Sequence, residues 1–296
     1  MATARELRRR IRSIKNIAKV TGALEAVSAS KVRRAQSQAL ASRAYTEAAY
    51  DVLRDLAAFH TEGLDHPLLN ERPERRRIMI ILFTSDRGLA GPYNVNVTRH
   101  AIRFAEESGV EVRYITVGRK GRDILLRRGD YVEAEFTGLP GTPSVMDVAP
   151  VNQAAVNDFL TGEVDEVNLV YTKFVNTLQQ VPVVERLLPL RPRPEDVEQV
   201  QEEIGDLRPV FSFEPNAEAV LEEILPRFTE VLLYQALLEA LASEHSARMV
   251  AMRNATENAN ALVEELTLRF NKARQLAITS EMLDIVGGAE ALRQKL

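Results

Sequence analysis

The sequence predicts an α/β domain combined with a long antiparallel coiled coil. Both ends of the chain carry long stretches with helical spacing of apolar residues and almost no Gly or Pro, the residues that most often end a helix. The middle alternates short apolar runs with amphipathic segments, which is typical of a mostly parallel sheet covered by helices. We therefore expect the two terminal segments to form a two-helix, left-handed shaft, with the α/β domain between them in the sequence.

These patterns divide the chain into four parts. We expect an N-terminal shaft helix over residues 1–62 and a central α/β domain over residues 75–190. Residues 191–216 are rich in Pro and acidic residues, so we expect them to form a linker. The C-terminal shaft helix is expected over residues 217–296.

The N-terminal segment has no Pro and only one Gly, Gly22, between Ala2 and about His60. Many residues on its apolar stripe are small, which allows a neighbouring helix to approach closely. Thr21 also lies on the stripe, and a polar residue in that position favours one register of a helix pair. We expect this helix to end near Gly63, because Gly is the residue that most often follows a helix.

The N-terminal segment is also strongly basic. Residues 1–43 hold eleven Lys or Arg and two acidic residues, although the whole chain has a formal net charge of −4. Such a segment is compatible with a targeting peptide, a nucleic-acid-binding surface, a solvated helix face, or a face that meets an acidic protein. The helical spacing continues without a cleavage-like break, and no aromatic residue precedes Tyr45. From the residues alone, a solvated helix face is therefore the favoured interpretation.

The central domain begins with the continuous apolar run Ile78–Phe83, which predicts a strand buried on both faces. A turn over Thr84–Pro92 and a helix over 94–107 follow it. The later elements alternate in the same way, as strands at 110–117, 131–136, 164–174 and 181–188 and helices at 119–128 and 144–160. This order predicts a Rossmann-like domain with a mostly parallel sheet.

The central domain lacks the phosphate-binding patterns of nucleotide enzymes, because neither G-x-x-x-x-G-K-[ST] nor G-x-G-x-x-G occurs. Ser85 and Asp86 follow the first strand and could act in catalysis, but a turn that caps the next helix is the favoured interpretation. The four His residues are scattered, with no pair three or four apart, so no metal site is predicted. We expect no catalytic site and no cofactor.

The C-terminal segment contains no Gly and no Pro from Arg227 to Val286. Its stripe, from Ile224 to Ala277, advances in steps of three and four residues, which is the period of a left-handed coiled coil. This helix therefore needs a partner along most of its length. The simplest partner is the N-terminal segment of the same chain, in the antiparallel direction.

The composition limits the remaining possibilities. The hydrophobic fraction is 45% and the mean hydropathy is −0.17, as in a folded, water-soluble protein. There is no Cys, which excludes disulfides, thiolate metal sites and thiol catalysis. No apolar run approaches the roughly 20 residues that a membrane-spanning helix needs.

Three parts of the sequence carry a family pattern. They are the N-terminal run from Arg12 to Gln36, the loop Ser85-Asp86-Arg87-Gly88-Leu89, and the C-terminal segments SEHSARMVAMRNATENA (243–259) and FNKARQ (270–275), followed by Ile278-Thr279. In this order and spacing they resemble the gamma subunit of F-type ATP synthases.

The resemblance implies a rotor rather than a catalyst. In that family the paired helices turn inside a ring of alpha and beta subunits, and the α/β domain meets the epsilon subunit and the membrane ring of c subunits. The chain would then couple ion flow through the c ring to ATP synthesis or hydrolysis, as a non-catalytic subunit of the proton-transporting complex. The implied location is the cytoplasmic face of the cell membrane, attached peripherally, with no nucleic acid and no membrane insertion.

The same resemblance assigns contact residues. The beta ring would be contacted by Arg274, Gln275, Thr279, Glu281, Arg248 and Leu24. The epsilon subunit and c ring would be contacted by Phe211, Phe213 and Glu214. The alternative function is a basic coiled-coil scaffold or a nucleic-acid-binding protein.

This chain departs from the family pattern at a few positions. Ala90 and Pro92 stand where Cys and Gly are commoner, Gly22 and Leu24 replace a frequent Lys and Met, and Phe270 stands for a usual Tyr. Without Cys, the dithiol switch of chloroplast relatives cannot operate.

Overall fold

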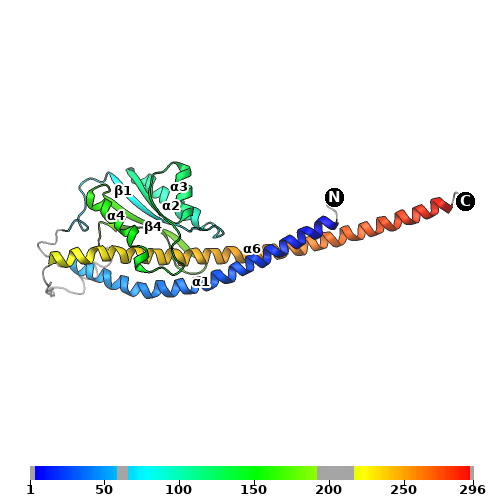
Figure 1. Ribbon diagram of the computed structural model, residues 1–296, viewed down its shortest axis with the longest axis horizontal. Coiled ribbons are helices and arrows are strands. Elements are labelled where there is room, and N and C mark those ends of the chain that lie inside the picture. Colours follow the sequence, from blue (N-terminus) through cyan, green and yellow to red (C-terminus); the bar gives the residue numbers. More distant parts are fainter. Residues whose placement is uncertain (1–3, 59–65, 192–216, 294–296) are drawn as a thin grey trace. The chain divides into compact units, whose positions relative to one another are not determined.

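The computed structural model describes residues 4–58, 66–191 and 217–293 (Figure 1). Packing divides the chain into two compact units. Unit 1 comprises residues 1–27 and 249–296, and unit 2 comprises residues 28–248. The two long helices, α1 (Ala4–Ala58) and α6 (Ala217–Arg293), contribute to both units. Each unit is described separately below.

Unit 2 contains a five-stranded sheet in the order β3-β2-β1-β4-β5. The strands are β1 (Arg77–Phe83), β2 (Glu111–Val117), β3 (Val132–Phe136), β4 (Glu166–Phe174) and β5 (Gln180–Leu188). The first four are parallel, and β5 pairs with β4 in the antiparallel direction. The predicted α/β domain with a mostly parallel sheet is therefore confirmed.

Helices cover both faces of this sheet. One face packs against α2 (Tyr93–Ser108) and α3 (Arg119–Arg128), and the other packs against α4 (Ala149–Thr161) and the unit-2 part of α6. Alternate residues of β1 serve the two cores: Ile78, Ile80 and Leu82 lie with α2, and Met79, Ile81 and Phe83 lie with α4 and α6. This period-2 burial on both sides explains why the run is continuously apolar.

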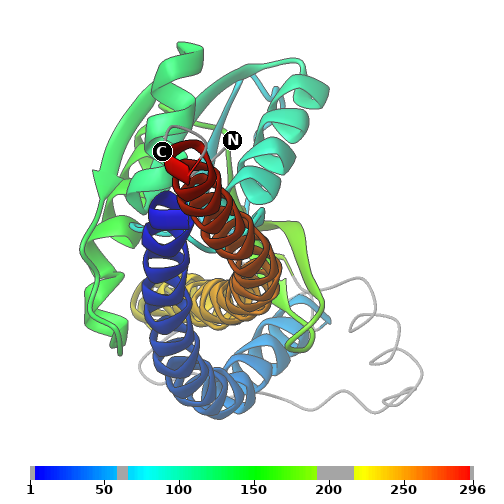
Figure 2. The same ribbon diagram turned by 90° about the vertical axis from the view of Figure 1, so that its right-hand side faces the viewer.

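The long helices pair in the antiparallel direction within each unit. In unit 1, the Thr256 hydroxyl donates a hydrogen bond to the Thr21 hydroxyl at 2.7 Å, and Figure 2 shows α1 and α6 side by side there. In unit 2, Arg43 pairs with Glu239 at 3.2 Å and the rings of Tyr50 and Phe228 meet edge to face. The expected intramolecular partner of the C-terminal helix is therefore the N-terminal helix.

The helix α6 continues past both ends of the Gly- and Pro-free run. It contains Pro226 near its start and two glycines near its end. An interior Pro removes a backbone hydrogen bond and costs about 3 kcal/mol. Leu221, Leu225 and Phe228 are buried around it, and burying each such side chain contributes about 1.5–3 kcal/mol, so packing outweighs that cost.

Other boundaries differ from the prediction by a few residues. The predicted helix over 144–160 is divided into a short 3₁₀ helix, η1 (Val145–Asp147), and α4. A capping box starts η1, in which the Asp147 carboxylate accepts hydrogen bonds from the backbone N–H and the hydroxyl of Ser144. Pro150, at the start of α4, has no backbone N–H with which to continue one helix across this point. Within the described residues, no helix is long and apolar enough to cross a membrane. Nearly all of the predicted linker, 192–216, lies outside the described residues.

Candidate functional site

The loop that follows β1 is fixed by side chains of its own and of α2. The backbone N–H of Ser85 donates to the Asn94 side-chain oxygen at 2.9 Å, and the Asn94 amide nitrogen donates to the Ser85 hydroxyl oxygen at 2.8 Å. The Ser85 hydroxyl donates in turn to the carbonyl of Arg87 at 2.5 Å. Ser85 therefore serves the turn, as expected, but it does not cap the next helix, because the N-cap of α2 is Pro92 with no side-chain cap hydrogen bond. These contacts include no nucleophile–base pair.

Asp86 ties this loop to the two neighbouring loops at the carboxyl edge of the sheet. One carboxylate oxygen accepts from the backbone N–H of Arg119 at 3.1 Å, and the other accepts from the backbone N–H of Gly138 at 2.8 Å. Both oxygens are thus committed to backbone groups, at the start of α3 and after β3. This use stabilises the edge rather than providing a general base.

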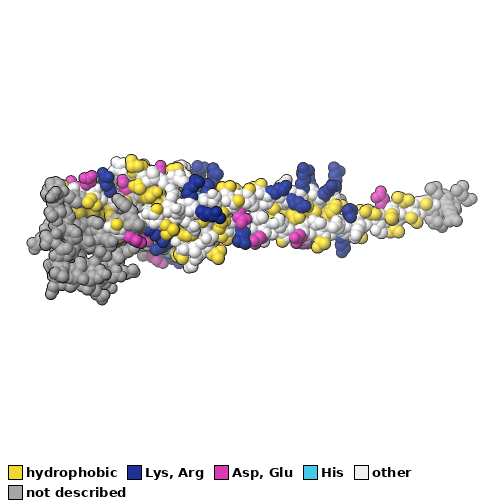
Figure 3. Space-filling model, turned by 90° about the horizontal axis from the view of Figure 1, so that it is seen from below, with side chains coloured by type: hydrophobic (Ala, Val, Ile, Leu, Met, Phe, Trp, Pro, Cys, Tyr) yellow, Lys and Arg dark blue, Asp and Glu magenta, His cyan; other side chains and the backbone are white. Residues whose placement is uncertain are grey.

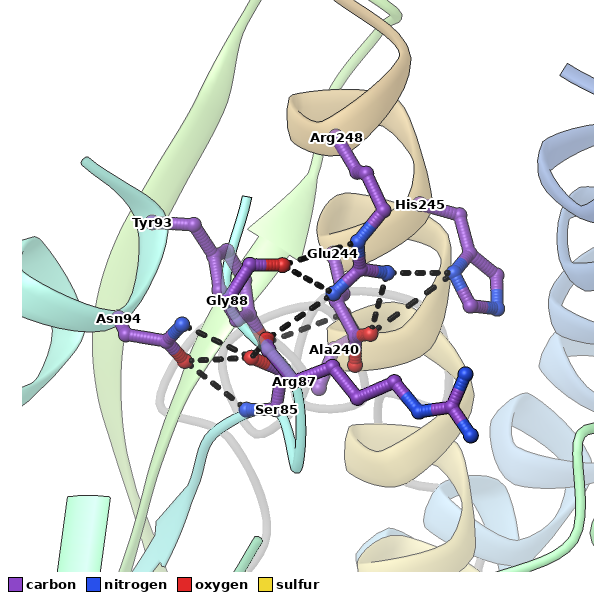
Figure 4. A network of polar contacts seen from close by, with 9 residues as sticks. All are labelled: Ser85, Arg87, Gly88, Tyr93, Asn94, Ala240, Glu244, His245 and Arg248. Carbon is purple, nitrogen blue, oxygen red and sulfur yellow. Dashed lines mark hydrogen bonds and ion pairs between the residues drawn. The ribbon is translucent and has the colours of Figure 1, made fainter. Parts of the chain in front are cut away.

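Arg248, on α6, clamps the same loop from the other side (Figure 4). Its guanidinium donates to the carbonyl of Arg87 at 3.1 Å and to the carbonyl of Gly88 at 3.3 Å. It also forms an ion pair with Glu244, one helical turn earlier, at 2.6 Å. The Arg248 and Glu244 side chains are only 14% and 13% exposed, so this pair is held largely away from water. We refer to Arg248, Glu244 and the loop carbonyls as the clamp.

The environment of the clamp shifts two pKa values. Burial raises the pKa of Glu244, and the nearby charge of Arg248 acts in the opposite direction. The pKa of His245 is lowered to about 4, mainly by burial and further by the nearby cations Arg248 and Lys31. The imidazole is therefore neutral at pH 7. A neutral His245 can accept from Arg248, whose guanidinium lies 3.5 Å from its Nδ1.

A further contact joins α2 to α6, since the buried Tyr93 hydroxyl donates to the carbonyl of Ala240 at 3.2 Å.

Two side chains of the loop after β1, those of Arg87 and Leu89, take no part in these contacts. The guanidinium of Arg87 points away from the clamp in Figure 4 and makes no hydrogen bond or ion pair with the described residues. Leu89 is 64% exposed and adopts φ +64°, a left-handed conformation that non-Gly residues rarely adopt. The backbone of the loop is thus held by hydrogen bonds, while the side chains of Arg87 and Leu89 are exposed.

The C-terminal part of α6 is the second candidate surface. Counting from the Thr21–Thr256 contact, Ala4 lies opposite about residue 273, so no described residue of α1 covers α6 beyond that point. Figure 1 shows α6 continuing past the N-terminal end of α1, and Figure 3 shows hydrophobic side chains along this segment. The exposed apolar residues of this segment are Leu276, Ile278, Met282, Leu283, Ile285 and Val286.

The predicted contact residues Arg274, Gln275, Thr279 and Glu281 are all exposed on this same segment. An uncovered apolar surface of this kind marks an interaction site. The described residues of this chain leave the segment uncovered.

The described residues contain no group of three or more His, Cys, Asp or Glu that could hold a metal ion. The polar residues at the sheet edge are engaged in loop contacts, and the long helix ends in an uncovered surface. This arrangement favours a role in assembly over chemistry on a small molecule.

Comparison with known proteins decides the family. The family model described as ATP synthase matches residues 3–292. The ATP synthase gamma chain of Herpetosiphon aurantiacus is 47% identical over 303 residues, covering 99% of this chain and 100% of that protein. The gamma chain of Roseiflexus sp. is 46% identical over 297 residues, with the same coverage.

The chain belongs to the ATP synthase gamma-chain family.

Solved structures agree in fold. A chain of the Euglena gracilis mitochondrial ATP synthase, in a structure of its OSCP, F1 and c-ring parts, has a TM-score of 0.65 at 18% identity and covers 98% of this chain and 94% of its own. A chain of the Tetrahymena thermophila ATP synthase central stalk and c-ring has a TM-score of 0.62 at 22% identity, with coverage of 80% and 99%. At these identities the likeness shows the fold alone.

Membership in the gamma-chain family confirms the predicted role as the central-stalk rotor subunit of ATP synthase, which is non-catalytic and belongs to a membrane-associated complex. The scaffold or nucleic-acid-binding alternative is not favoured.

Not every predicted contact residue lies on the outer surface. Arg248 is largely buried and bound within the clamp, and Leu24 is half-buried on α1. Their assignment to the beta ring stays a prediction. Phe211, Phe213 and Glu214 lie outside the described residues.

Sequence reasoning missed the roles of Glu244 and Asn94. The only signal for Glu244 was its spacing of four residues from Arg248 on one helix face. That spacing does not reveal burial. Asn94 lies nine residues from Ser85 with no pattern to join them, so its role could not be found from the sequence.

Proposed function

We propose that the uncovered C-terminal part of α6 contacts a loop of a beta subunit, with Arg274, Gln275, Thr279 and Glu281 as the polar contact residues. The exposed apolar side chains of the same segment support this proposal, because burying them against a partner would remove apolar surface from water, which is favourable. A contact on one face of a turning helix meets each beta subunit of a ring in succession. The contact therefore transmits the angle of the rotor to the catalytic sites.

We further propose that the alpha and beta subunits form the ring around the paired helices, and that the epsilon subunit and c ring bind near Phe211, Phe213 and Glu214. The assembled complex would then lie at the cytoplasmic face of the cell membrane. Two observations support this proposal: the chain belongs to the gamma-chain family, and these segments of its sequence resemble the pattern of that family. A paired helix suits this role, since two helices packed side by side resist twisting and bending better than one.

The clamp suits the same role. It joins the loop after β1 to α6 through the hydrogen bonds of Arg248 to the two carbonyls, so a load on α6 passes to that loop, while the ion pair with Glu244 orients Arg248 within α6. We propose that Arg248 acts in this way inside the chain. Arg87 in the same loop is exposed, so a partner could reach its guanidinium.

The experiment compares two double variants of the full chain, each assembled with cognate alpha and beta subunits. Arg274→Ala with Gln275→Ala removes the proposed contact. Arg253→Ala with Asn254→Ala is the matched control, because it removes an exposed Arg and its neighbouring amide from the paired part of the same helix. We expect the first variant to lose coupled ATP turnover and the second to retain it.

Circular dichroism of the two variant chains should match that of the original chain, because all four side chains are exposed. Equal turnover of the two assembled complexes would contradict the proposed contact. Failure of the original chain to assemble with alpha and beta subunits would contradict the proposed partners.

A further inference from the structure

A cavity of about 380 Å³ lies within unit 2, beside the clamp and at the carboxyl edge of the sheet. Residues of the loops that follow β1, β2 and β3 line it, together with residues of α1 and α6. The volume lies in the range of small-ligand pockets and far exceeds the roughly 30 Å³ that one water occupies. The charged and titratable lining residues are Lys31, Asp86, Arg87, Glu244, His245 and Arg248.

Both carboxylates at this cavity are already engaged. Asp86 accepts hydrogen bonds from the backbone N–H groups of Arg119 and Gly138. Glu244 forms the ion pair with Arg248 inside the clamp. Neither carboxylate is therefore left to receive a cation.

Two of the cations are not engaged. Neither the Lys31 ammonium nor the Arg87 guanidinium makes a hydrogen bond or an ion pair with the described residues. Counting Arg248 with them, three cations face two carboxylates, so the lining has an excess of one positive charge. Positive charge together with N–H donors that lack acceptors favours an anion as the ligand.

His245 supplies a third donor. The residue is only 5% exposed, and its Nδ1 lies 3.5 Å from the guanidinium of Arg248, which can only donate. In the opposite tautomer Nδ1 would have to donate to Glu244 Oε1 at 3.9 Å, which is too long for a hydrogen bond. Because the ring is neutral at pH 7, Nδ1 is the acceptor and Nε2 carries the hydrogen.

The Nε2–H group of His245 has no partner among the described residues. Figure 4 shows the Nε2 edge of the ring turned away from Glu244, on the side to which the Arg87 guanidinium extends. The charge of Lys31 also acts on this ring, since it contributes to lowering its pKa. Three donors, from α6, α1 and the loop after β1, thus line one cavity without an acceptor of their own.

We propose that this cavity binds a small oxyanion of the phosphate class, held by the Nε2–H of His245, the Lys31 ammonium and the Arg87 guanidinium. Guanidinium and ammonium groups are common protein ligands of phosphate oxygens. The oxygens of a tetrahedral anion point in four directions, so one ion can accept from donors on three elements. Because the donors come from separate elements and not from one glycine-rich loop, no sequence motif marks the site.

The bound oxyanion would join α1, α6 and the loop after β1. Its negative charge would favour the imidazolium form of His245 and so raise the pKa of that ring. It would also stabilise the folded chain, because the unfolded chain has no such site. This inference does not depend on the proposed subunit contacts.

The test is a titration of the full chain with inorganic phosphate, followed through the ring resonances of His245 by nuclear magnetic resonance. Chloride at equal ionic strength is the reference anion. At pH 7 we expect phosphate to shift these resonances with saturation and chloride to leave them unchanged. The pKa of His245 should be higher in saturating phosphate than in chloride, where it should lie near 4.

Variants locate the bound anion. Lys31→Met and Arg87→Met each remove one donor, and each should weaken phosphate binding by about tenfold to a hundredfold in isothermal titration calorimetry, as expected for a lost hydrogen bond to a charged group. Both side chains are exposed, so both variants should fold as the original chain does. Arg33→Met is the matched control, because it removes an exposed cation of α1 that does not line the cavity, and it should bind phosphate with unchanged affinity.

Three results would overturn the proposal. The first is a His245 spectrum that phosphate does not change. The second is a saturating shift of the same size in chloride, which would show that the site does not require an oxyanion. The third is equal phosphate affinity of Lys31→Met and Arg33→Met, which would mean that the anion binds outside this cavity.

Discussion

Replacing Arg248 by Met tests whether the clamp holds the loop after β1. The substitution keeps an unbranched apolar side chain about as long as the apolar stem of Arg but removes the guanidinium. It leaves the Glu244 carboxylate without its ion-pair partner and removes the donor to the carbonyls of Arg87 and Gly88. Breaking a buried ion pair from one side typically costs about 3–5 kcal/mol. We expect about 3 kcal/mol here, because Glu244 and Arg248 also line a cavity that water can enter.

The assay is urea unfolding of the full chain followed by circular dichroism. The chain supplies a matched control, because Arg253 and Glu257 form an ion pair with the same spacing on the same helix. Their side chains are 68% and 64% exposed, so Arg253→Met should cost only about 0.3–0.5 kcal/mol. Glu244→Gln combined with Arg248→Met should recover part of the loss, since no charge then stays buried. Equal costs for Arg248→Met and Arg253→Met would refute the reasoning.

The pH dependence provides a second readout of the same variant. Burial raises the pKa of Glu244, and removing the Arg248 charge raises it further. A carboxyl whose folded pKa exceeds its unfolded pKa binds its proton more tightly in the folded chain. Its contribution to stability is therefore fully present below the unfolded pKa and is lost as the pH rises through the folded pKa. The deficit of Arg248→Met should be smaller in mildly acidic buffer than at neutral pH.

Three further predictions concern single residues. Gly22→Ala should stabilise the chain by about 1 kcal/mol in thermal unfolding, because the added Cβ would lie 3.9 Å from Thr256 and Ala is the better helix former; a lower midpoint would contradict this. Gly118→Ala should instead reduce soluble expression or the unfolding midpoint severely, since its φ is +105° and its Cβ would come within 2.0 Å of the Thr84 carbonyl; wild-type stability would show that the loop can move. The His245 ring should titrate near pH 4 by nuclear magnetic resonance, and a value near 6.5 would mean that the ring is solvated.

Much of the fold was predictable because its determinants are local. The run Ile78–Phe83 is apolar at every position, and only a strand buried on both faces requires that. The glycines Gly109 and Gly129 end helices in the left-handed conformation, as such residues commonly do. The antiparallel direction of β5 was also predictable, because only a short connection separates it from β4, whereas a parallel neighbour needs a crossover of about a dozen residues or more. The helix α6 continues through Pro226 because core packing around that residue, which is a tertiary effect, outweighs the cost of an interior Pro.

The candidate site was only partly predictable. The exposed segment around Arg274 follows from a stripe that weakens into small and polar residues, together with the family pattern. The clamp does not, because Arg248 meets carbonyls some 160 residues away in the chain. The family pattern suggested that Arg248 faces a partner, whereas its guanidinium is already bound inside this chain.

The most direct test of the central claim is to watch the chain turn. The full chain, labelled at an exposed residue of its α/β domain, is assembled with surface-fixed alpha and beta subunits and supplied with ATP. We predict rotation of the label in one direction, at a rate that follows ATP hydrolysis. An assembled complex that hydrolyses ATP while the label stays fixed would contradict the assignment of this chain as the rotor.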